Sequence, residues 1–266
     1  MTNRISSTAP VPALIQRARD EGDLSAQSFD AIMLAADIGA QIQAGLGVAP
    51  DDVPAAEVTL VTMMPDDSGS IAMANNESAV RAGHNEVLDS LEKCTQADGI
   101  LVHTRYLNGH VLYPYRPLAA SPRMTAKNYR AVHGTPLYDQ TVVLLGTVLA
   151  KSKELEASGI PVRTVTLIVS DGADVHSSQQ TAASVRSLVE DMRRSENHVV
   201  AAMGIDDGQT DFRRVFREMG IPNEWILTLR SSATEIRAAF RLFSQSAIRV
   251  SQSAAFSASA FGGFGG

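Results

Sequence analysis

Residues 58–70 read VTLVTMMPDDSGS, and this stretch decides the fold. Its first seven residues are β-branched or apolar, which predicts a buried strand. The six that follow form a polar turn rich in Asp, Ser and Gly. A second run, residues 162–169, is almost entirely apolar, as are strands that a parallel sheet buries on both faces. It ends in Ser170-Asp171-Gly172. Two buried strands that each lead into a polar loop predict a functional edge where both strands end.

Strand and helix patterns alternate around these two runs, from residue 57 to about residue 249. Asn108-Gly109 between apolar residues predicts a hairpin. The predicted strands are residues 58–64, 99–104, 111–113, 162–169, 198–203 and 225–229, and the predicted helices are 77–93, 137–156, 179–194, 211–219 and 234–244. This alternation predicts an α/β fold: a doubly wound, mostly parallel sheet with helices on both faces. Ligands of such sheets bind beyond the carboxyl ends of the strands.

We expect three regions. Residues 1–55 are an N-terminal helical extension and linker, with helices over 11–21 and 25–45, the second capped by Ser25. The second helix is apolar on two sides, which predicts packing against the main domain or a partner. Residues 56–250 form the main domain. Residues 251–266 are a tail rich in Ser, Ala, Phe and Gly. This composition predicts a flexible tail, with docking into a partner's groove through its three Phe side chains as the alternative.

Composition narrows the class of protein. The chain has 266 residues and a formal net charge of −6, which argues against a nucleic-acid binder because such proteins gather Lys and Arg. It lacks an apolar run of membrane-span length, and residues 1–12 lack the apolar core of a signal peptide. Cys94 is the single cysteine, so neither an intrachain disulfide nor a Cys-based zinc cluster can form. We therefore expect a cytoplasmic protein that binds neither membrane nor nucleic acid.

Hydroxyl and carboxyl side chains lie in three loops at the edge of the predicted sheet. The candidate metal ligands are Asp66, Ser68, Ser70, Thr135 and Asp171. Their hard oxygens suit Mg²⁺, and Mn²⁺ or Ca²⁺ are the alternatives.

In this order and on this background, the five residues resemble the metal-ion-dependent adhesion site (MIDAS) of von Willebrand factor A (vWA) domains. The resemblance covers roughly residues 57–249 and fills every ligand position. The segment of residues 134–139 also resembles the bacterial cytoplasmic branch that includes the tellurite-resistance protein TerY, although the helices of residues 1–55 have no counterpart that we can place there.

The vWA resemblance implies direct metal contacts from Ser68 and Ser70, and from Thr135 when a ligand is engaged. It implies that Asp66 and Asp171 act mainly through metal-bound waters, and that a Glu or Asp of a partner protein completes the coordination. The expected function is a Mg²⁺-dependent adaptor or scaffold in bacterial stress response, phage defence or a kinase/phosphatase-linked system.

Two other functions stay open. One is a structural subunit that self-associates through the metal edge and the tail. The other is a metal-dependent phosphatase or hydrolase, which is disfavoured because no nucleophile lies beside an activating base in the sequence. We therefore expect a protein that is not an enzyme.

Asp206-Asp207-Gly208 offers a second metal position, but an ordinary strand-to-helix loop explains it better. His133 and His176 flank the site loops, and we interpret them as ordinary loop histidines.

Overall fold

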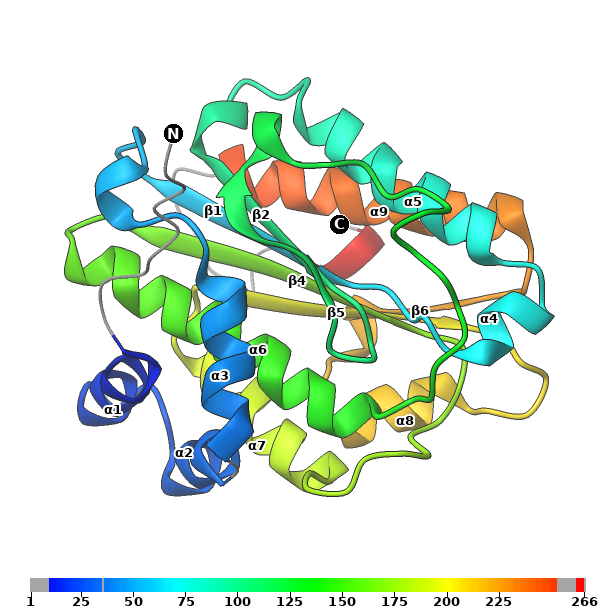
Figure 1. The fold of residues 1–266 in the computed structure, drawn as a ribbon, viewed down its shortest axis with the longest axis horizontal. Helices are drawn as coiled ribbons and strands as arrows, with labels where there is room; N and C mark the ends of the chain where they lie inside the picture. The colour runs from blue at the N-terminus through cyan, green and yellow to red at the C-terminus, as the bar shows by residue number, and fades with distance from the viewer. Residues whose placement is uncertain (1–9, 35, 253–261, 266) are drawn as a thin grey trace.

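The computed structural model describes residues 10–34, 36–252 and 262–265, and its centre is a six-stranded sheet (Figure 1). The strands are β1 Val58–Met64, β2 Ile100–Arg105, β3 Val111–Pro117, β4 Val162–Ser170, β5 His198–Ile205 and β6 Ile226–Leu229. Their order in the sheet is β3-β2-β1-β4-β5-β6, and only β3 runs antiparallel to its neighbour. Because β1 and β4 are adjacent and parallel, their carboxyl ends lie at the same edge. This is the mostly parallel α/β sheet that the sequence predicts.

Helices cover both faces of the sheet (Figure 1). One face carries α5 Glu77–Leu91 and α9 Ala233–Gln252, and the other carries α6 Leu137–Ala157, α7 Ala182–Arg194 and α8 Phe212–Glu218. Each predicted helix of the main domain is present. The last one is longer than predicted and continues to Gln252, because its buried positions extend to Val250 and Ser251. The short helix α4, Gly69–Met73, is an addition that the sequence did not predict.

Three helices precede the sheet: α1 Val11–Asp20, α2 Ala26–Met33 and α3 Ala36–Leu46. Our prediction of one helix over residues 25–45 is wrong, since α2 ends at Met33. The two halves pack against different elements. The N–H and hydroxyl of Ser25 both donate to Asp191 on α7 at 2.7 Å, whereas Ile42 on α3 packs against Gly146 of α6. One straight helix cannot reach both contacts. Ser25 caps α2 as predicted, accepting from the Ser28 N–H.

The N-terminal helices contribute side chains to the same apolar core as α6 and the strands. The side chains of Ile15, Ile32 and Ile42 are buried in the same apolar cluster as the residues of α6. At the surface, Lys153 of α6 forms ion pairs with Glu21, at 2.9 Å, and with Asp23. These helices therefore pack on the α6–α7 layer as an integral part of the fold.

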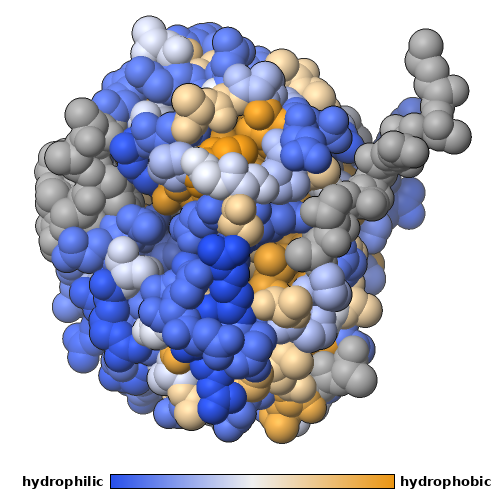
Figure 2. Space-filling model, turned by 90° about the vertical axis from the view of Figure 1, so that its left-hand side faces the viewer, coloured by the Kyte–Doolittle hydropathy of each residue, from blue (hydrophilic) through white to orange (hydrophobic). Residues whose placement is uncertain are grey.

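In the described part of the chain, no single helix is both long and apolar enough to cross a membrane. The bent pair Ala26–Met33 and Asp37–Asp52 meets that length and composition only when its halves are taken together. Figure 2 shows the side of the molecule opposite α4. Its surface is mostly hydrophilic and carries several separate apolar patches. The predicted flexible tail falls mainly on residues 253–261, which lie outside the described residues, as do residues 1–9.

If α3 belongs to the cooperative fold, Ile42→Ala lowers the free energy of unfolding by about 2–5 kcal/mol, because it leaves a cavity against α6. The Ile42 side chain is 0% exposed, whereas that of Leu34 is 67% exposed. Leu34→Ala is therefore the matched control and changes stability by less than about 0.5 kcal/mol. Urea denaturation followed by circular dichroism measures both. Equal midpoints for Ile42→Ala and the unsubstituted protein would show that α3 contributes no stability.

Candidate metal-binding site

The carboxylate of Asp66 joins the loop after β1 to the end of β4. It is fully buried and accepts three hydrogen bonds. Its Oδ1 accepts from the Ser68 N–H at 2.7 Å, and its Oδ2 accepts from the Ser170 hydroxyl at 3.0 Å and the Asp171 N–H at 3.1 Å. These bonds hold the two polar loops at one point of the sheet edge.

The side chains of Ser68, Ser70 and Asp171 converge beside Asp66. Both hydroxyls donate to Asp171 Oδ1, at 3.1 Å from Ser68 and 2.6 Å from Ser70. Ser68 is the first residue before α4 and Ser70 lies in its first turn, so the start of this short helix aims both hydroxyls at β4. Four of the five predicted ligands thus form one hydrogen-bonded cluster.

The cluster suits a small hard cation. The two hydroxyl oxygens stand 2.9 Å apart. Each hydroxyl is within hydrogen-bond distance of Asp171 Oδ1 and of the other hydroxyl, so three oxygens gather at one point. Neighbouring ligands of an octahedral Mg²⁺, bound at about 2.0–2.1 Å, are about 2.9 Å from one another. Among the described residues, neither Asp66 nor Asp171 forms an ion pair with Lys or Arg, so a cation would supply the missing positive charge.

Thr135 lies next to this cluster without a hydrogen bond to it in the described contacts. A methyl group added at Gly172 would stand 4.0 Å from the Thr135 hydroxyl oxygen, which places that oxygen beside the residue after Asp171. The backbone of Thr135 is held from the same loop: its N–H donates to His176 Nδ1 at 2.9 Å, and its carbonyl accepts from the Val175 and His176 N–H groups. The Thr135 side chain is buried.

The loop after β4 is also tied to the start of α6. Asp139 accepts from the N–H groups of Ser178, Gln179 and Gln180, at 2.9, 3.1 and 2.7 Å. In return, the Tyr138 N–H donates to Asp174 at 3.1 Å. These reciprocal bonds set the distance between Thr135 and Asp171.

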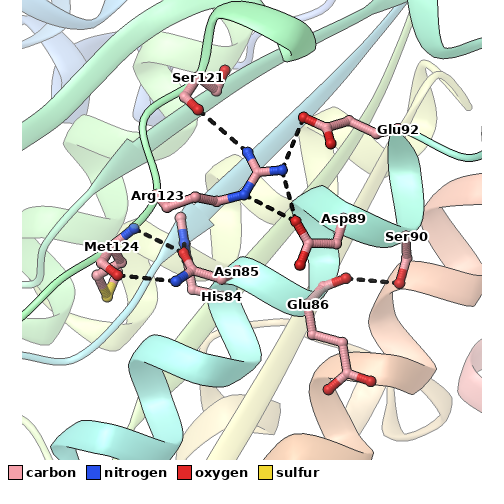
Figure 3. Close-up of polar contacts among 9 residues, drawn as sticks. All are labelled: His84, Asn85, Glu86, Asp89, Ser90, Glu92, Ser121, Arg123 and Met124. Atoms are coloured by element: carbon pink, nitrogen blue, oxygen red, sulfur yellow. Dashed lines mark hydrogen bonds and ion pairs between the residues drawn. The ribbon is translucent and has the colours of Figure 1, made fainter.

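The connection that delivers Thr135, residues 118–136, is anchored on α5 (Figure 3). Asn85 bonds both the N–H and the carbonyl of Met124, at 2.8 and 2.9 Å. The Arg123 guanidinium lies between Asp89 at 2.7 Å and Glu92 at 2.8 Å. Further along, the Ala131 N–H donates to Glu77 at 3.0 Å. These bonds fix the connection on α5 before it reaches the site.

Sequence reasoning missed two supporting residues. The Ser170 hydroxyl bonds Asp66, and the Tyr129 hydroxyl donates to the Asp66 carbonyl. Ser170 stands directly before a predicted ligand and could have been found by its position, whereas nothing in the sequence links Tyr129 to Asp66. Asp67 points away from the cluster: its Oδ1 accepts the Asn108 N–H at 3.0 Å and so holds the β2–β3 turn.

Burial and mutual repulsion disfavour the charged form of these acids. Burial raises the pKa of Asp66. Burial, followed by the charge of Asp66, raises the pKa of Asp171 to about 6, and the same two causes raise that of Asp67 to about 7. Such a site gains most from a bound cation, because the cation favours the ionised carboxylates.

Other metal chemistry finds little support in the described residues. They contain no group of three or more His, Cys, Asp or Glu side chains placed to hold a metal ion. A site at residues 66–70 therefore depends on its hydroxyl ligands. Asp206 and Asp207 accept N–H bonds from Gly208, Gln209 and Thr210 of their own turn, at 2.7–2.9 Å, as an ordinary loop does.

Neither a known protein-family model nor a curated protein sequence matches this chain. Solved structures do. The pilus adhesin SpaC from Lactobacillus rhamnosus GG, in its open conformation, aligns with a TM-score of 0.52 at 17% identity over 73% of this chain and 30% of the adhesin. This chain therefore spans less than a third of that protein's length. At this identity the likeness shows a shared fold alone.

Two other solved structures carry the vWA name. The SpRpn10 VWA domain aligns with a TM-score of 0.48 at 11% identity, over 70% of this chain and 94% of that domain. A von Willebrand factor type A protein from Catenulispora acidiphila aligns with a TM-score of 0.44 at 15% identity, over 72% of this chain and 43% of that one. These two likenesses are too weak to carry an argument. The order and direction of the strands confirm the expected fold class, a doubly wound α/β sheet, and the metal ligands stay a prediction.

The raised pKa of Asp171 predicts a pH dependence in EDTA. Between its ordinary pKa of 3.8 and about 6, the unfolded chain ionises Asp171 while the folded chain keeps the proton, so rising pH destabilises the fold. Asp171→Asn removes this penalty and can still accept both hydroxyl bonds. We expect the melting temperature of Asp171→Asn, relative to that of the unsubstituted protein, to increase as the pH rises from about 4 to 6. Above about pH 6 the difference between the two melting temperatures should stay constant. Differential scanning fluorimetry across this range measures the gap, and a gap independent of pH would contradict the pKa assignment.

Proposed function

We propose that this chain is a vWA-type protein-interaction domain that binds Mg²⁺ through Asp66, Ser68, Ser70, Thr135 and Asp171 and uses it to hold a carboxylate of a partner protein. The observation that supports this most directly is the pair of hydroxyl oxygens 2.9 Å apart, each donating its proton to Asp171. That arrangement gathers three oxygens at the spacing of neighbouring ligands of a small hard cation. The order of the motifs along the chain supports the same proposal.

Each residue has a distinct part in this proposal. Ser68 and Ser70 are neutral ligands, so the bound ion keeps most of its positive charge. Asp171 orients both hydroxyls, and Asp66 holds the loops together. Thr135 comes from a segment that is bonded to the same loop through His133, and in this proposal it completes the site when a partner engages. A bound Mg²⁺ supplies an electrophilic position that attracts a Glu or Asp side chain.

The proposed setting is a cytoplasmic bacterial adaptor related to the TerY branch, with a role in stress response, phage defence or a kinase/phosphatase-linked system. We propose that it is not an enzyme, since among the described residues Ser68 and Ser70 bond to each other and to Asp171 and not to a histidine that could act as a base. One structure that shares the fold is a pilus adhesin, which agrees with an adhesive role.

Metal binding is tested by isothermal titration calorimetry. We expect Mg²⁺, and more weakly Ca²⁺, to bind the unsubstituted chain, and Ser70→Ala to weaken binding by about 10–100-fold because an inner ligand is lost. Ser90→Ala is the matched control, since this hydroxyl bonds only the Glu86 carbonyl within α5. Equal affinities for all three proteins would rule out the ligand assignment.

Partner binding is tested by affinity capture from a bacterial lysate, in Mg²⁺ and in EDTA, with Thr135→Ala alongside. A protein retained only by the unsubstituted chain in Mg²⁺ would support adhesion through the metal. The captured partner should then lose binding when its exposed Glu or Asp residues are changed to Gln or Asn. Retention under every condition would exclude the metal as the link. Hydrolysis of a phosphoester that needs both Mg²⁺ and Ser70 would favour the hydrolase alternative.

A further inference from the structure

Exposed apolar side chains gather around the candidate metal site. The described residues include six exposed large apolar side chains, and three of them belong to the loops that carry the predicted metal ligands. These three are Met73, Val132 and Val175, which are 81%, 69% and 72% exposed. Apolar surface in water costs free energy, and a group of such side chains at one edge marks a contact surface. The other three lie at the end of α2 and on α9: Met33, Leu34 and Leu242.

Two of these side chains stand directly beside predicted ligands. Met73 is the last residue of α4 and follows Ser70 by three positions, so both lie on the same side of that helix. Val175 belongs to the loop after β4, and its N–H donates to the Thr135 carbonyl at 3.2 Å. Met73 and Val175 therefore approach the site from two different loops.

Val132 approaches from the third loop. It precedes His133, whose N–H donates to the Asp67 carbonyl at 3.1 Å and whose carbonyl accepts from the Gly69 N–H at 3.0 Å. Figure 1 accordingly shows this connection beside α4 at one end of the sheet. The exposed side chains of Met73, Val132 and Val175, here named the apolar collar, thus come from the three loops that meet at the candidate metal site.

The collar is positively charged on the side of Val132. Lys127 and Arg130 are exposed, and neither forms an ion pair with another residue that the structure describes. Arg130 follows Tyr129, whose hydroxyl bonds the Asp66 carbonyl, so this part of the chain lies close to the site. Two exposed cations beside the collar favour a partner with negative charge on that side.

The other side of the site carries the opposite charge. Asp206 and Asp207 follow β5, which is the strand next to β4. A partner segment with acidic side chains at one end is therefore oriented, with that end toward Lys127 and Arg130 and away from the two acids.

We propose that the apolar collar and the candidate metal site together bind one kind of partner, an exposed protein segment in which a single Glu or Asp is flanked on both sides by apolar side chains. This inference rests on the proposed function, because the bound Mg²⁺ holds the carboxylate. The flanking side chains pack on the collar, and their burial adds affinity that the carboxylate alone does not supply. A segment that is only acidic leaves the collar in water and binds less tightly.

The preference for apolar neighbours is tested with an array of capped heptapeptides that have Glu at the centre and random residues elsewhere, probed with the labelled protein in Mg²⁺. We expect Leu, Ile, Val, Phe and Met to be enriched beside the Glu. The best peptide is then compared, by fluorescence anisotropy, with one that has Gln at the centre and one that has Ser in place of the flanking apolar residues. Each change should weaken binding by about tenfold or more, and EDTA should abolish it.

The collar itself is tested by the triple variant Met73→Ser, Val132→Ser and Val175→Ser, whose fold is checked by circular dichroism. We expect its Mg²⁺ affinity in calorimetry to be unchanged, because no predicted ligand is altered, and its affinity for the best peptide to fall by about tenfold or more. The matched control replaces the three exposed apolar side chains away from the site, and it should leave both affinities unchanged: Met33→Ser, Leu34→Ser and Leu242→Ser.

Three results would overturn this inference while Mg²⁺ still binds. One is an array in which no peptide binds or apolar neighbours are not preferred, and another is equal peptide affinity for the triple variant and the unsubstituted chain. The third is a Mg²⁺-dependent dimer, seen by light scattering and lost in the triple variant, since it would make a second copy the occupant of the collar. A chain that does not bind Mg²⁺ in calorimetry would instead contradict the proposed function, and this inference with it.

Discussion

The buried carboxylate of Asp66 is the interaction on which the rest of the site depends. A carboxylate removed from water is costly unless donors surround it, and here two N–H groups and one hydroxyl do so. These donors come from the loop after β1 and from the end of β4, which are distant in sequence and adjacent in the sheet. Satisfying one buried acid therefore brings Ser68 and Ser70 against Asp171.

The resulting arrangement is electrostatically unfavourable by itself. Burial raises the pKa of Asp66, and burial together with the charge of Asp66 raises the pKa values of Asp67 and Asp171. Folded proteins place such groups together mainly where function requires it. The proposed Mg²⁺ would relieve this repulsion.

The five candidate ligands come from two parts of the chain. Asp66, Ser68, Ser70 and Asp171 sit directly on the sheet edge. Thr135 reaches the site on a long connection that is fixed on α5 by Asn85 and Arg123 and held at its end by His176. The backbone of His133, two residues before Thr135, is also bonded to Asp67 and Gly69, so this connection is held against the loop after β1 as well.

The sequence by itself determined the strands, the main helices and the order of the site residues. Apolar runs, Asn108-Gly109 and the polar loops after residues 64 and 169 are local signals, and local periodicity suffices to interpret them. It also located the five candidate ligands, because parallel strands end at one edge. Only the tertiary structure decided where α2 ends. Both halves of the predicted helix are equally apolar, so the sequence does not separate them. They are separate helices because the first contacts Asp191 and the second contacts Gly146. The bond from Tyr129 to Asp66 and the contact of Phe264 with Trp225 likewise depend on residues that are far apart in the chain, and only the packing of the sheet and its helices brings them together.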